Sequence, residues 1–303
     1  MSTIPLRPLG FGEILDGAVQ LYRRDFGLYY LIALLGALPG YILALLFEPD
    51  LSSLLGDGAP GFDAFFSEFR IVMAIGIVSG AMAWVGVLAV AAAMVERIGE
   101  RLASVGRAYL DAIRYLPRAA LAALTALFVF FVVGVVVFMV STLVAAPLIA
   151  TGNALVSLLA FAVFLLPIMA LALAWLAATF GILPAVIIEN RPAFDALRRS
   201  LSLCNGGWLR VIGIMCVAQI INLVPGFAVQ ALFGIDNLFL SPEELGTIDS
   251  GRQWLLNTIN FVVSPLTTPF MVGSILMLFH DRRVRKEAFD LETAAGVMDS
   301  GTS

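Results

Sequence analysis

Charge is scarce in this 303-residue chain: 13% of the residues are charged, whereas 60% are hydrophobic and the mean hydropathy is +0.97. Soluble globular domains carry about 25% charged residues, so this composition excludes an ordinary soluble domain and indicates an integral membrane protein. The apolar runs are unbroken rather than alternating. Unbroken runs are typical of membrane helices and not of a β-barrel.

Cysteine and histidine are also rare. The two cysteines, Cys204 and Cys216, do not make a disulfide framework. The single histidine, His280, has no second histidine or cysteine near it in the sequence to complete a metal site. Because it is the only histidine, no serine or cysteine has the histidine partner that a catalytic nucleophile requires. We therefore predict a non-enzymatic protein with no catalytic residue, no metal and no cofactor. We also predict no nucleic-acid partner.

Six apolar segments account for most of the chain. They lie at about 27–47, 70–95, 119–147, 154–188, 209–233 and 254–280, and each is long enough to cross a bilayer as a helix. No charged residue lies between Arg118 and Glu189, and we expect the turn that divides this stretch at Thr151-Gly152-Asn153. The expected fold is an all-α membrane protein with six transmembrane helices.

Basic residues are distributed unevenly among the segments that join these spans. Sixteen of the eighteen basic residues precede span one, follow span six, or lie between spans two and three or spans four and five. Only Arg70 and Arg252 lie on the other side, where the loops at 48–69 and 235–252 are acidic. The positive-inside rule therefore predicts a multi-pass membrane protein with both termini and the tail at 282–303 in the cytoplasm.

An amphipathic stretch precedes spans one, three and five, which suggests a threefold internal repeat. We expect three interfacial helices on the cytoplasmic side, each followed by two spans, in a single membrane domain with repeat units at about 9–96, 104–189 and 192–281. Bends near Gly27, Pro117 and Gly206-Gly207 should separate each helix from its span. The alternative is that any basic amphipathic linker before an apolar run looks self-similar. The expected apolar faces are Phe11, Ile14, Leu15, Ala18 and Tyr22; Val105, Tyr109, Ala112, Ile113 and Leu116; and Phe194, Leu197, Leu201 and Cys204.

Two glycine pairs lie four residues apart within the spans, Gly36 with Gly40 and Gly76 with Gly80. Small residues at this spacing let a second helix approach closely. We expect ordinary helix packing within the chain at both pairs.

No charged residue lies in the interior of a span. A charged residue there would be the clearest sequence sign of a pathway through the membrane. Polar residues gather in spans five and six, where Pro225 and Pro265 are expected to break the helices. Hydrogen bonds between helices are the simplest explanation for them. If they line a pathway instead, the candidate polar cavity consists of Gln219, Asn222, Asn257 and Asn260.

The arginines form the strongest cluster of candidate functional groups. Topology determination and snorkelling to the lipid headgroups explain them without a binding role. Two pairs nevertheless lie on the polar sides of amphipathic stretches, where guanidinium groups suit bidentate binding of phosphate. These pairs, Arg23 with Arg24 and Arg198 with Arg199, are our candidate site for membrane lipid, including anionic lipid, or for a membrane-protein partner.

Three segments resemble a broad group of uncharacterised prokaryotic integral membrane proteins, related to the membrane domain attached to some glycerophosphoryl diester phosphodiesterases. They are RPLGFGEILDGAVQLYRRDFG at 7–27, ILPAVIIENRPAFDALRRSLSLCNGGWLRVIGI at 182–214 and FHDRRVRKEAFDLE at 279–292. Catalysis in the two-domain enzymes belongs to a soluble barrel rich in His, Glu and Asp, so the resemblance carries over no catalytic residue. It implies a stand-alone module of unknown specific role in a prokaryotic inner membrane. We predict that this module is lipid-associated or partner-binding. The alternative function is a transporter or channel subunit with a polar path between spans five and six.

Overall fold

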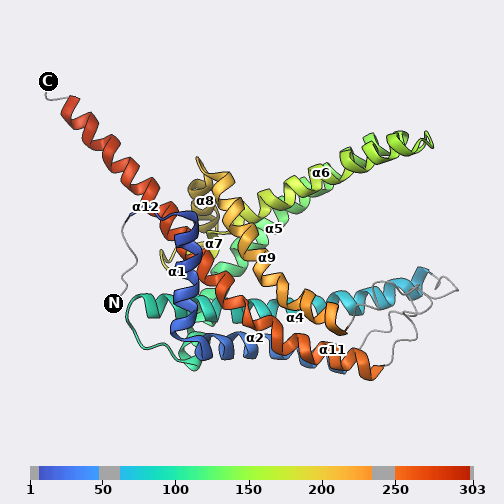
Figure 1. Cartoon of the computed structure of the whole chain (residues 1–303), viewed down its shortest axis with the longest axis horizontal. Helices are drawn as coiled ribbons and strands as arrows, with labels where there is room; N and C mark the ends of the chain where they lie inside the picture. Colours follow the sequence, from blue (N-terminus) through green and yellow to red (C-terminus); the bar gives the residue numbers. More distant parts are fainter. Residues whose placement is uncertain (1–6, 48–61, 234–249, 301–303) are drawn as a thin grey trace. The chain divides into compact units, whose positions relative to one another are not determined.

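The computed structural model (Figure 1) describes residues 7–47, 62–233 and 250–300, and no strand is present among them. Most of the two acidic loops, 48–61 and 235–249, lies outside the described residues. The helices are α1 (Phe11–Arg24), α2 (Phe26–Leu46), α4 (Phe62–Ile98), α5 (Val105–Ile149), α6 (Ala154–Thr179), α7 (Ile182–Ile187), α8 (Ala193–Cys204), α9 (Trp208–Phe233), α11 (Ser250–Val263) and α12 (Thr268–Ser300), with a short 3-10 helix, η2 (Ser264–Leu266), before α12.

Six helical segments among the described residues are long and apolar enough to cross a membrane, which confirms the prediction of an all-α membrane protein with six spans. They are Phe26–Leu46, Phe69–Ile98, Val105–Ile149, Ala154–Ile187, Trp208–Leu232 and Trp254–Glu287. The turn between the third and fourth spans lies where it was predicted. Gly152 there has a φ of +68°, which suits glycine, and the Asn153 side chain accepts hydrogen bonds from the first amides of α6.

The chain divides into two compact units. The first consists of Met1–Ile14, Tyr115–Cys216 and Ile275–Ser303, and the second of Leu15–Arg114 and Val217–Ser274. These bounds differ from those of the expected repeat units, and the threefold repeat stays a prediction. In the first unit α5 and α6 run side by side (Figure 1), with edge-to-face contacts between Phe130 and Trp175 and between Phe138 and Phe164.

In the second unit α2 and α4 pack backbone against backbone. A Cβ atom placed on Gly36 would lie 2.5 Å from the Cα of Gly86, and one placed on Gly86 would lie 2.8 Å from the Cα of Gly36. Gly40 contacts α4 one turn further along. The first glycine pair therefore packs within the chain as expected, whereas the Cβ positions of Gly76 and Gly80 have no described atom within 4 Å.

Proline interrupts one of the two helices in which a break was expected. Around Pro265, α11 ends at Val263 and the 3-10 helix intervenes before α12, so this break is confirmed. The break expected at Pro225 is wrong, because α9 continues through this residue. A proline removes one backbone hydrogen bond, and the remaining bonds of a membrane helix can keep it continuous.

Tyrosine hydroxyls stabilise the broken helix in the second unit. The Tyr22 hydroxyl donates to the carbonyl of Leu266 at 2.6 Å, and the Tyr30 hydroxyl donates to the carbonyl of Val262 at 3.0 Å. In hydrocarbon an unpaired carbonyl is costly, and bonds from neighbouring helices can satisfy groups at such a break. Burial raises the pKa of Tyr22, which precedes the first span, to about 12, so its hydroxyl keeps the donated proton at neutral pH.

The three amphipathic stretches are helical, but only two of them are separate helices. Asp25 divides α1 from α2, where its carboxylate accepts a 2.8 Å hydrogen bond from Arg97 at the end of α4, and residues 205–207 divide α8 from α9. The separation expected at Pro117 is wrong, because residues 105–149 form one helix. The face expected over 105–116 is also wrong in part: Ile113 is 58% exposed, whereas the small side chains of Ala108 and Ala112 are buried.

Candidate functional site

Helix α8 packs against the break between α6 and α7 in the first unit. The Ser200 hydroxyl accepts a 2.9 Å hydrogen bond from the amide of Gly181 and donates a 2.6 Å bond to the carbonyl of Ala178. A Cβ on Gly181 would lie 3.0 Å from that hydroxyl oxygen and 3.1 Å from the Cα of Ser200, so a larger residue here would require α8 to shift by a few tenths of an ångström. The Cys204 thiol donates to the carbonyl of Ala177, and burial raises its pKa to about 12, which makes it an unreactive thiol.

The apolar face expected for α8 is rotated in the structure. Phe194 and Leu201 are 62% and 40% exposed, and the buried residues are Ala193, Ala196, Ser200, Leu203 and Cys204. Small side chains face α6 and α7 because the helices approach closely there. Of the residues expected on this face, Phe194 and Leu201 point outward, whereas Cys204 is buried and Leu197 packs against a buried cluster of α5, α7 and α8 residues.

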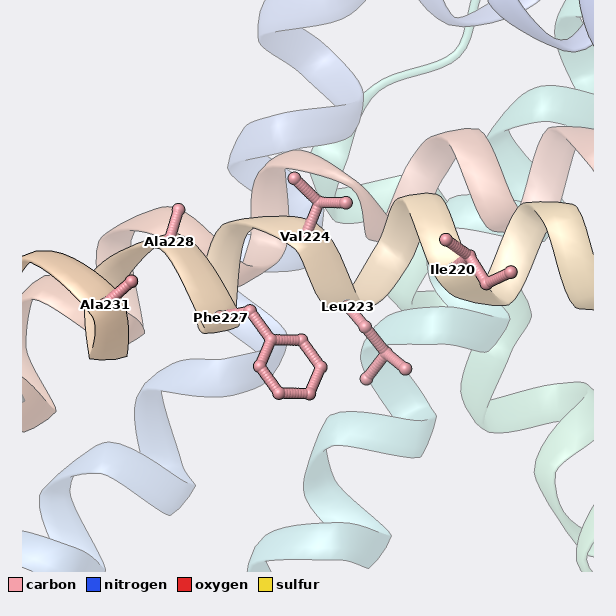
Figure 2. Close-up of a pocket in the computed structure, with 6 residues that line it drawn as sticks. All are labelled: Ile220, Leu223, Val224, Phe227, Ala228 and Ala231. Atoms are coloured by element: carbon pink, nitrogen blue, oxygen red, sulfur yellow. The ribbon is translucent and has the colours of Figure 1, made fainter. Parts of the chain in front are cut away.

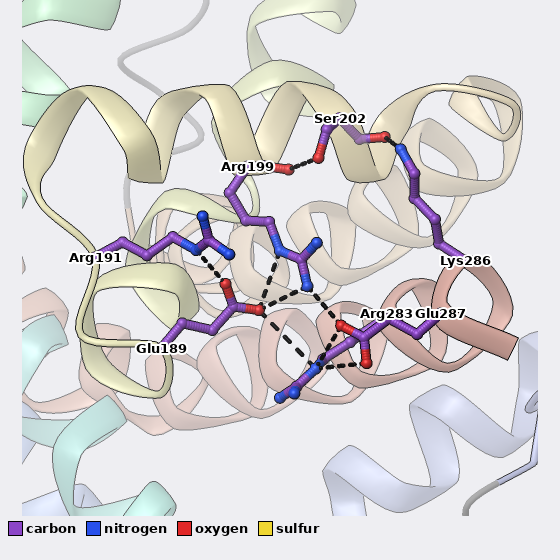
Figure 3. A network of polar contacts seen from close by, with 7 residues as sticks. All are labelled: Glu189, Arg191, Arg199, Ser202, Arg283, Lys286 and Glu287. Carbon is purple, nitrogen blue, oxygen red and sulfur yellow. Dashed lines mark hydrogen bonds and ion pairs between the residues drawn. The ribbon is translucent and has the colours of Figure 1, made fainter. Parts of the chain in front are cut away.

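Arg199, one of the predicted site residues, is the centre of an ion-pair cluster of Glu189, Arg191, Arg199, Arg283 and Glu287 (Figure 3). It donates to Glu189 at 2.8 and 3.0 Å and to Glu287 at 2.7 Å. Arg191 pairs with Glu189 at 2.5 Å, and Arg283 with Glu287 at 2.9 Å. The cluster therefore joins the segment after the fourth span, α8 and α12 by charge.

Burial and pairing act in opposite directions on Glu189 in this cluster. Burial alone would raise the pKa of its carboxyl group, but the hydrogen bonds from Arg199 and Arg191 lower it below the usual value. The carboxylate is thus held in its charged form. The side chains of Arg199 and Glu189 are 15% and 10% exposed, which limits the access of a ligand to this ion pair.

Two basic residues of α12 cap the C-terminal end of α8. Lys286 donates to the carbonyl of Ser202 at 2.7 Å (Figure 3), and Arg282 donates to the carbonyls of Leu203 and Asn205 at 2.8 and 3.1 Å. The last carbonyls of a helix have no partner within it and carry partial negative charge. Cationic side chains from α12 supply both the missing donors and the opposite charge.

The fully buried carboxylate of Asp281 fixes the segment that leads into α1. It accepts hydrogen bonds from the amide of Leu9 at 2.8 Å and from Arg285 at 2.9 and 3.0 Å, and it forms an ion pair with Arg210 at 3.2 Å. Both arginines also donate to the carbonyl of Leu9. We call Asp281, Arg210, Arg285 and the Leu9 backbone the Asp281 site.

Sequence reasoning missed the Asp281 site, because it ended the sixth span at residue 280 and assigned no role to Asp281. The local signal was Arg285 four residues after Asp281, a spacing that places both side chains on one side of a helix. No local pattern points to Arg210 or Leu9 as the other partners.

Glu13 caps the N-terminus of α1. Its carboxylate accepts hydrogen bonds from Arg7 at 2.6 and 3.1 Å and from the amide of Gly10, just before the helix, at 2.6 Å. The bond from a residue at the third helical position back to the N-cap amide is half of a capping box. The Arg7 hydrogen bonds, with the bond from Gly10, lower the pKa of Glu13 to about 2.

The predicted arginine pairs have different environments. Arg23 and Arg24 lie in the last turn of α1 and are exposed. Arg198 is exposed on α8, whereas its neighbour Arg199 belongs to the ion-pair cluster. The two pairs belong to different units, the first pair to the second unit and the other to the first. That they form one site stays a prediction.

Two of the four residues of the candidate polar cavity line a common pocket. Asn257 and Asn260 line a pocket of about 270 Å³ in the second unit, and neither Gln219 nor Asn222 is among its lining residues. Asn222 instead accepts a 3.0 Å hydrogen bond from Thr267, as an interhelical bond would predict.

A larger pocket, of about 430 Å³, follows one side of α9 (Figure 2). The side chains that line it are all apolar and come from this helix alone: Ile220, Leu223, Val224, Phe227, Ala228 and Ala231. An apolar face of this kind suits lipid chains and offers no group for chemistry. Among the described residues, no group of three His, Cys, Asp or Glu side chains could hold a metal ion.

Comparison with known proteins identifies a family but no activity. No curated protein and no solved structure matches the chain. Residues 98–281, more than half of the chain, match the family described as Domain of unknown function (DUF7847). The matched range includes three residues of the ion-pair cluster, Glu189, Arg191 and Arg199. It also includes Asp281 and Arg210 of the Asp281 site. The protein therefore belongs to the DUF7847 family.

Proposed function

We propose that this protein is a non-enzymatic integral membrane module that associates with anionic lipid at the cytoplasmic surface of a prokaryotic inner membrane, with both termini in the cytoplasm. One observation carries the proposal. On the outer side of α8, exposed Arg198 lies between Phe194 and Leu201, which are 62% and 40% exposed. These positions are four and three residues apart and share one side of the helix.

An exposed stripe of this composition suits the boundary between headgroups and acyl chains. Phe194 and Leu201 would enter the acyl region, while the guanidinium group of Arg198 would reach the phosphates. Trp208 and Leu209 continue the exposed apolar surface at the start of α9, 38% and 87% exposed. Tryptophan is enriched at membrane interfaces, so the composition supports an α8 that lies along the membrane surface.

The contacts also distinguish the predicted arginines by their availability. Arg199 donates to two carboxylates, so lipid would have to compete with Glu189 and Glu287 for it. Exposed Arg198, Arg23 and Arg24 are better placed for phosphate, and the bidentate geometry of arginine favours it over lysine there. We therefore centre the proposed lipid site on Arg198 and assign Arg199 to holding α8 in place.

The experiment compares lipid that co-purifies with the parent protein, with Arg198→Gln and with Arg198→Lys. One basic residue near a charged leaflet contributes about 1 kcal/mol, so Arg198→Gln should reduce the bound anionic lipid about fivefold. Arg198→Lys keeps the charge and should show a smaller loss, caused by the bidentate geometry. Bound phosphatidylcholine, added during purification, serves as the control and should not change.

A triple variant, Arg23→Gln with Arg24→Gln and Arg198→Gln, makes the test decisive. If it inserts with the parent orientation and retains as much anionic lipid as the parent, these arginines are topology signals and the proposal is wrong.

A transporter or channel subunit is the second candidate function. The observation that favours it is the pocket lined by Asn257 and Asn260 beside the broken helix, since transporters use broken helices at binding sites. Gln219 and Asn222 do not line that pocket, so lipid association has the better support. Tracer flux through proteoliposomes tests the alternative: flux that is absent from Asn260→Leu would favour transport.

A further inference from the structure

The pocket of about 270 Å³ lies in the second unit, where α2 faces the end of α11 and η2. Its polar side chains are Asn257 and Asn260 of α11 and Ser264 of η2. Tyr41 of α2 and Phe261 of α11 supply aromatic surface. None of the residues that line the pocket is an aspartate, glutamate, lysine, arginine or histidine.

The pocket opens within a membrane-spanning segment. The sixth span begins at Trp254, three residues before Asn257, and Ser264 lies seven residues after Asn257. At a rise of about 1.5 Å per residue, the polar groups extend from about 5 to about 15 Å into the span. This segment is long and apolar enough to cross a bilayer, so the pocket belongs to a part of the chain that would enter the membrane.

Contacts beside the pocket fix its walls. The ring of Tyr41 stacks on that of Phe261, with centroids 4.4 Å apart and an angle of 13° between the planes. The Tyr41 hydroxyl is within 2.8 Å of the hydroxyl oxygen of Thr258, and the Tyr30 hydroxyl binds the carbonyl of Val262. Because α2 is held to α11 at these points, the pocket exists before a ligand enters, as in most small-molecule sites.

We propose that this pocket binds the hydroxyl-bearing head of an uncharged lipid, a lipid of the diacylglycerol type. A charged headgroup would lose its hydration here and find no opposite charge. A pure hydrocarbon chain would offer the carboxamide of Asn260, which lines the pocket, no hydrogen-bond donor or acceptor. An uncharged hydroxyl or ester group avoids both costs. The volume suits the head of such a lipid and not its acyl chains, which would lie along the apolar surface outside.

This proposal does not depend on the anionic-lipid site on α8. The two sites use different residues in different units and select headgroups of different charge. Loss of one form of binding is therefore distinguishable from loss of the other.

The test uses the full chain in phosphatidylcholine nanodiscs and a diacylglycerol with a photoactivatable group near its glycerol. Crosslinked peptides are identified by mass spectrometry. Asn260→Leu replaces the carboxamide with an apolar side chain of the same branching and number of heavy atoms, and Ala44→Phe fills the pocket, which Ala44 lines. Gln219→Leu is the matched control, because Gln219 is a polar residue of a span that does not line this pocket.

We expect crosslinks on α2 and α11 in the parent and in Gln219→Leu, and at least fivefold fewer in Asn260→Leu and in Ala44→Phe. Unlabelled diacylglycerol should compete, whereas phosphatidic acid with the same chains should not. Undiminished crosslinking in both pocket variants, or equal competition by phosphatidic acid, would overturn the proposal. The competition in the parent protein decides the question even if the variants fold poorly.

Discussion

At the scale of single residues, the carboxylate of Asp281 is tightly held, because it is fully buried and bound by two arginines and one backbone amide. Removing one partner from a buried charge cluster leaves the other charges uncompensated, at a cost of about 3–5 kcal/mol. Asp281→Asn should therefore lower the thermal stability in detergent strongly. It should also make the segment before α1 sensitive to protease, since Leu9 loses its charged acceptor.

Asp195→Asn provides the matched control for Asp281→Asn. Asp195 lies in the same unit but is exposed on α8, so its substitution should change stability by less than about 0.5 kcal/mol. Equal stability of the two variants would show that the Asp281 site contributes little.

Glu13 makes the start of α1 sensitive to acid. Its folded pKa of about 2 lies below the ordinary value of 4.5, chiefly because of the Arg7 hydrogen bonds. A depressed pKa stabilises the folded state fully above the unfolded pKa, so this contribution should be lost as the pH falls from about 4.5 to about 2. Hydrogen exchange of the peptide that contains Gly10 should accelerate over that range, after correction for intrinsic rates. Glu13→Gln should abolish the acceleration.

At the scale of helices, the close approach of α2 and α4 depends on Gly36. Gly36→Ala places a Cβ 2.5 Å from the backbone of Gly86, and backbone cannot rotate away as a side chain can. We expect a loss of at least 1–3 kcal/mol, the usual cost of overpacking, seen as a lower melting temperature in detergent. Gly76→Ala is the control: it meets no described atom within 4 Å, and alanine favours helix over glycine. A neutral Gly36→Ala would contradict the packing.

The same scale explains why the face expected for α8 was rotated. The face was predicted from the spacing of the large apolar residues. This spacing indicates a helix but does not show which side of the helix packs against another helix. In the structure Ser200 and the neighbouring small residues face α6 and α7, while Phe194 points outward. A helix in a bilayer has apolar surroundings on its lipid side as well, so hydrophobicity alone does not separate the two sides.

At the scale of the whole molecule, the distribution of basic residues predicts which loops face the cytoplasm. In a variant with Cys204→Ser and Cys216→Ala, a new cysteine at Ser53 or at Ser250 should react with an impermeant reagent added to intact cells. A cysteine at Ser104, close to Arg107, or at Ser303 should react only after permeabilisation. External labelling at Ser104 would contradict the six-span topology.

The sequence by itself determined the class of the molecule, the six spans and the turn at Gly152, because each of these depends on the local composition of about 20 residues or fewer. It also singled out the arginines and the polar residues of the last two spans. The tertiary structure alone decided which arginines are engaged. Arg199 and Arg198 are adjacent in the chain, yet one binds Glu189 and Glu287 and the other is exposed. The partners of Asp281 include Leu9, 272 positions away. Such contacts follow from how distant helices pack, which no local pattern contains.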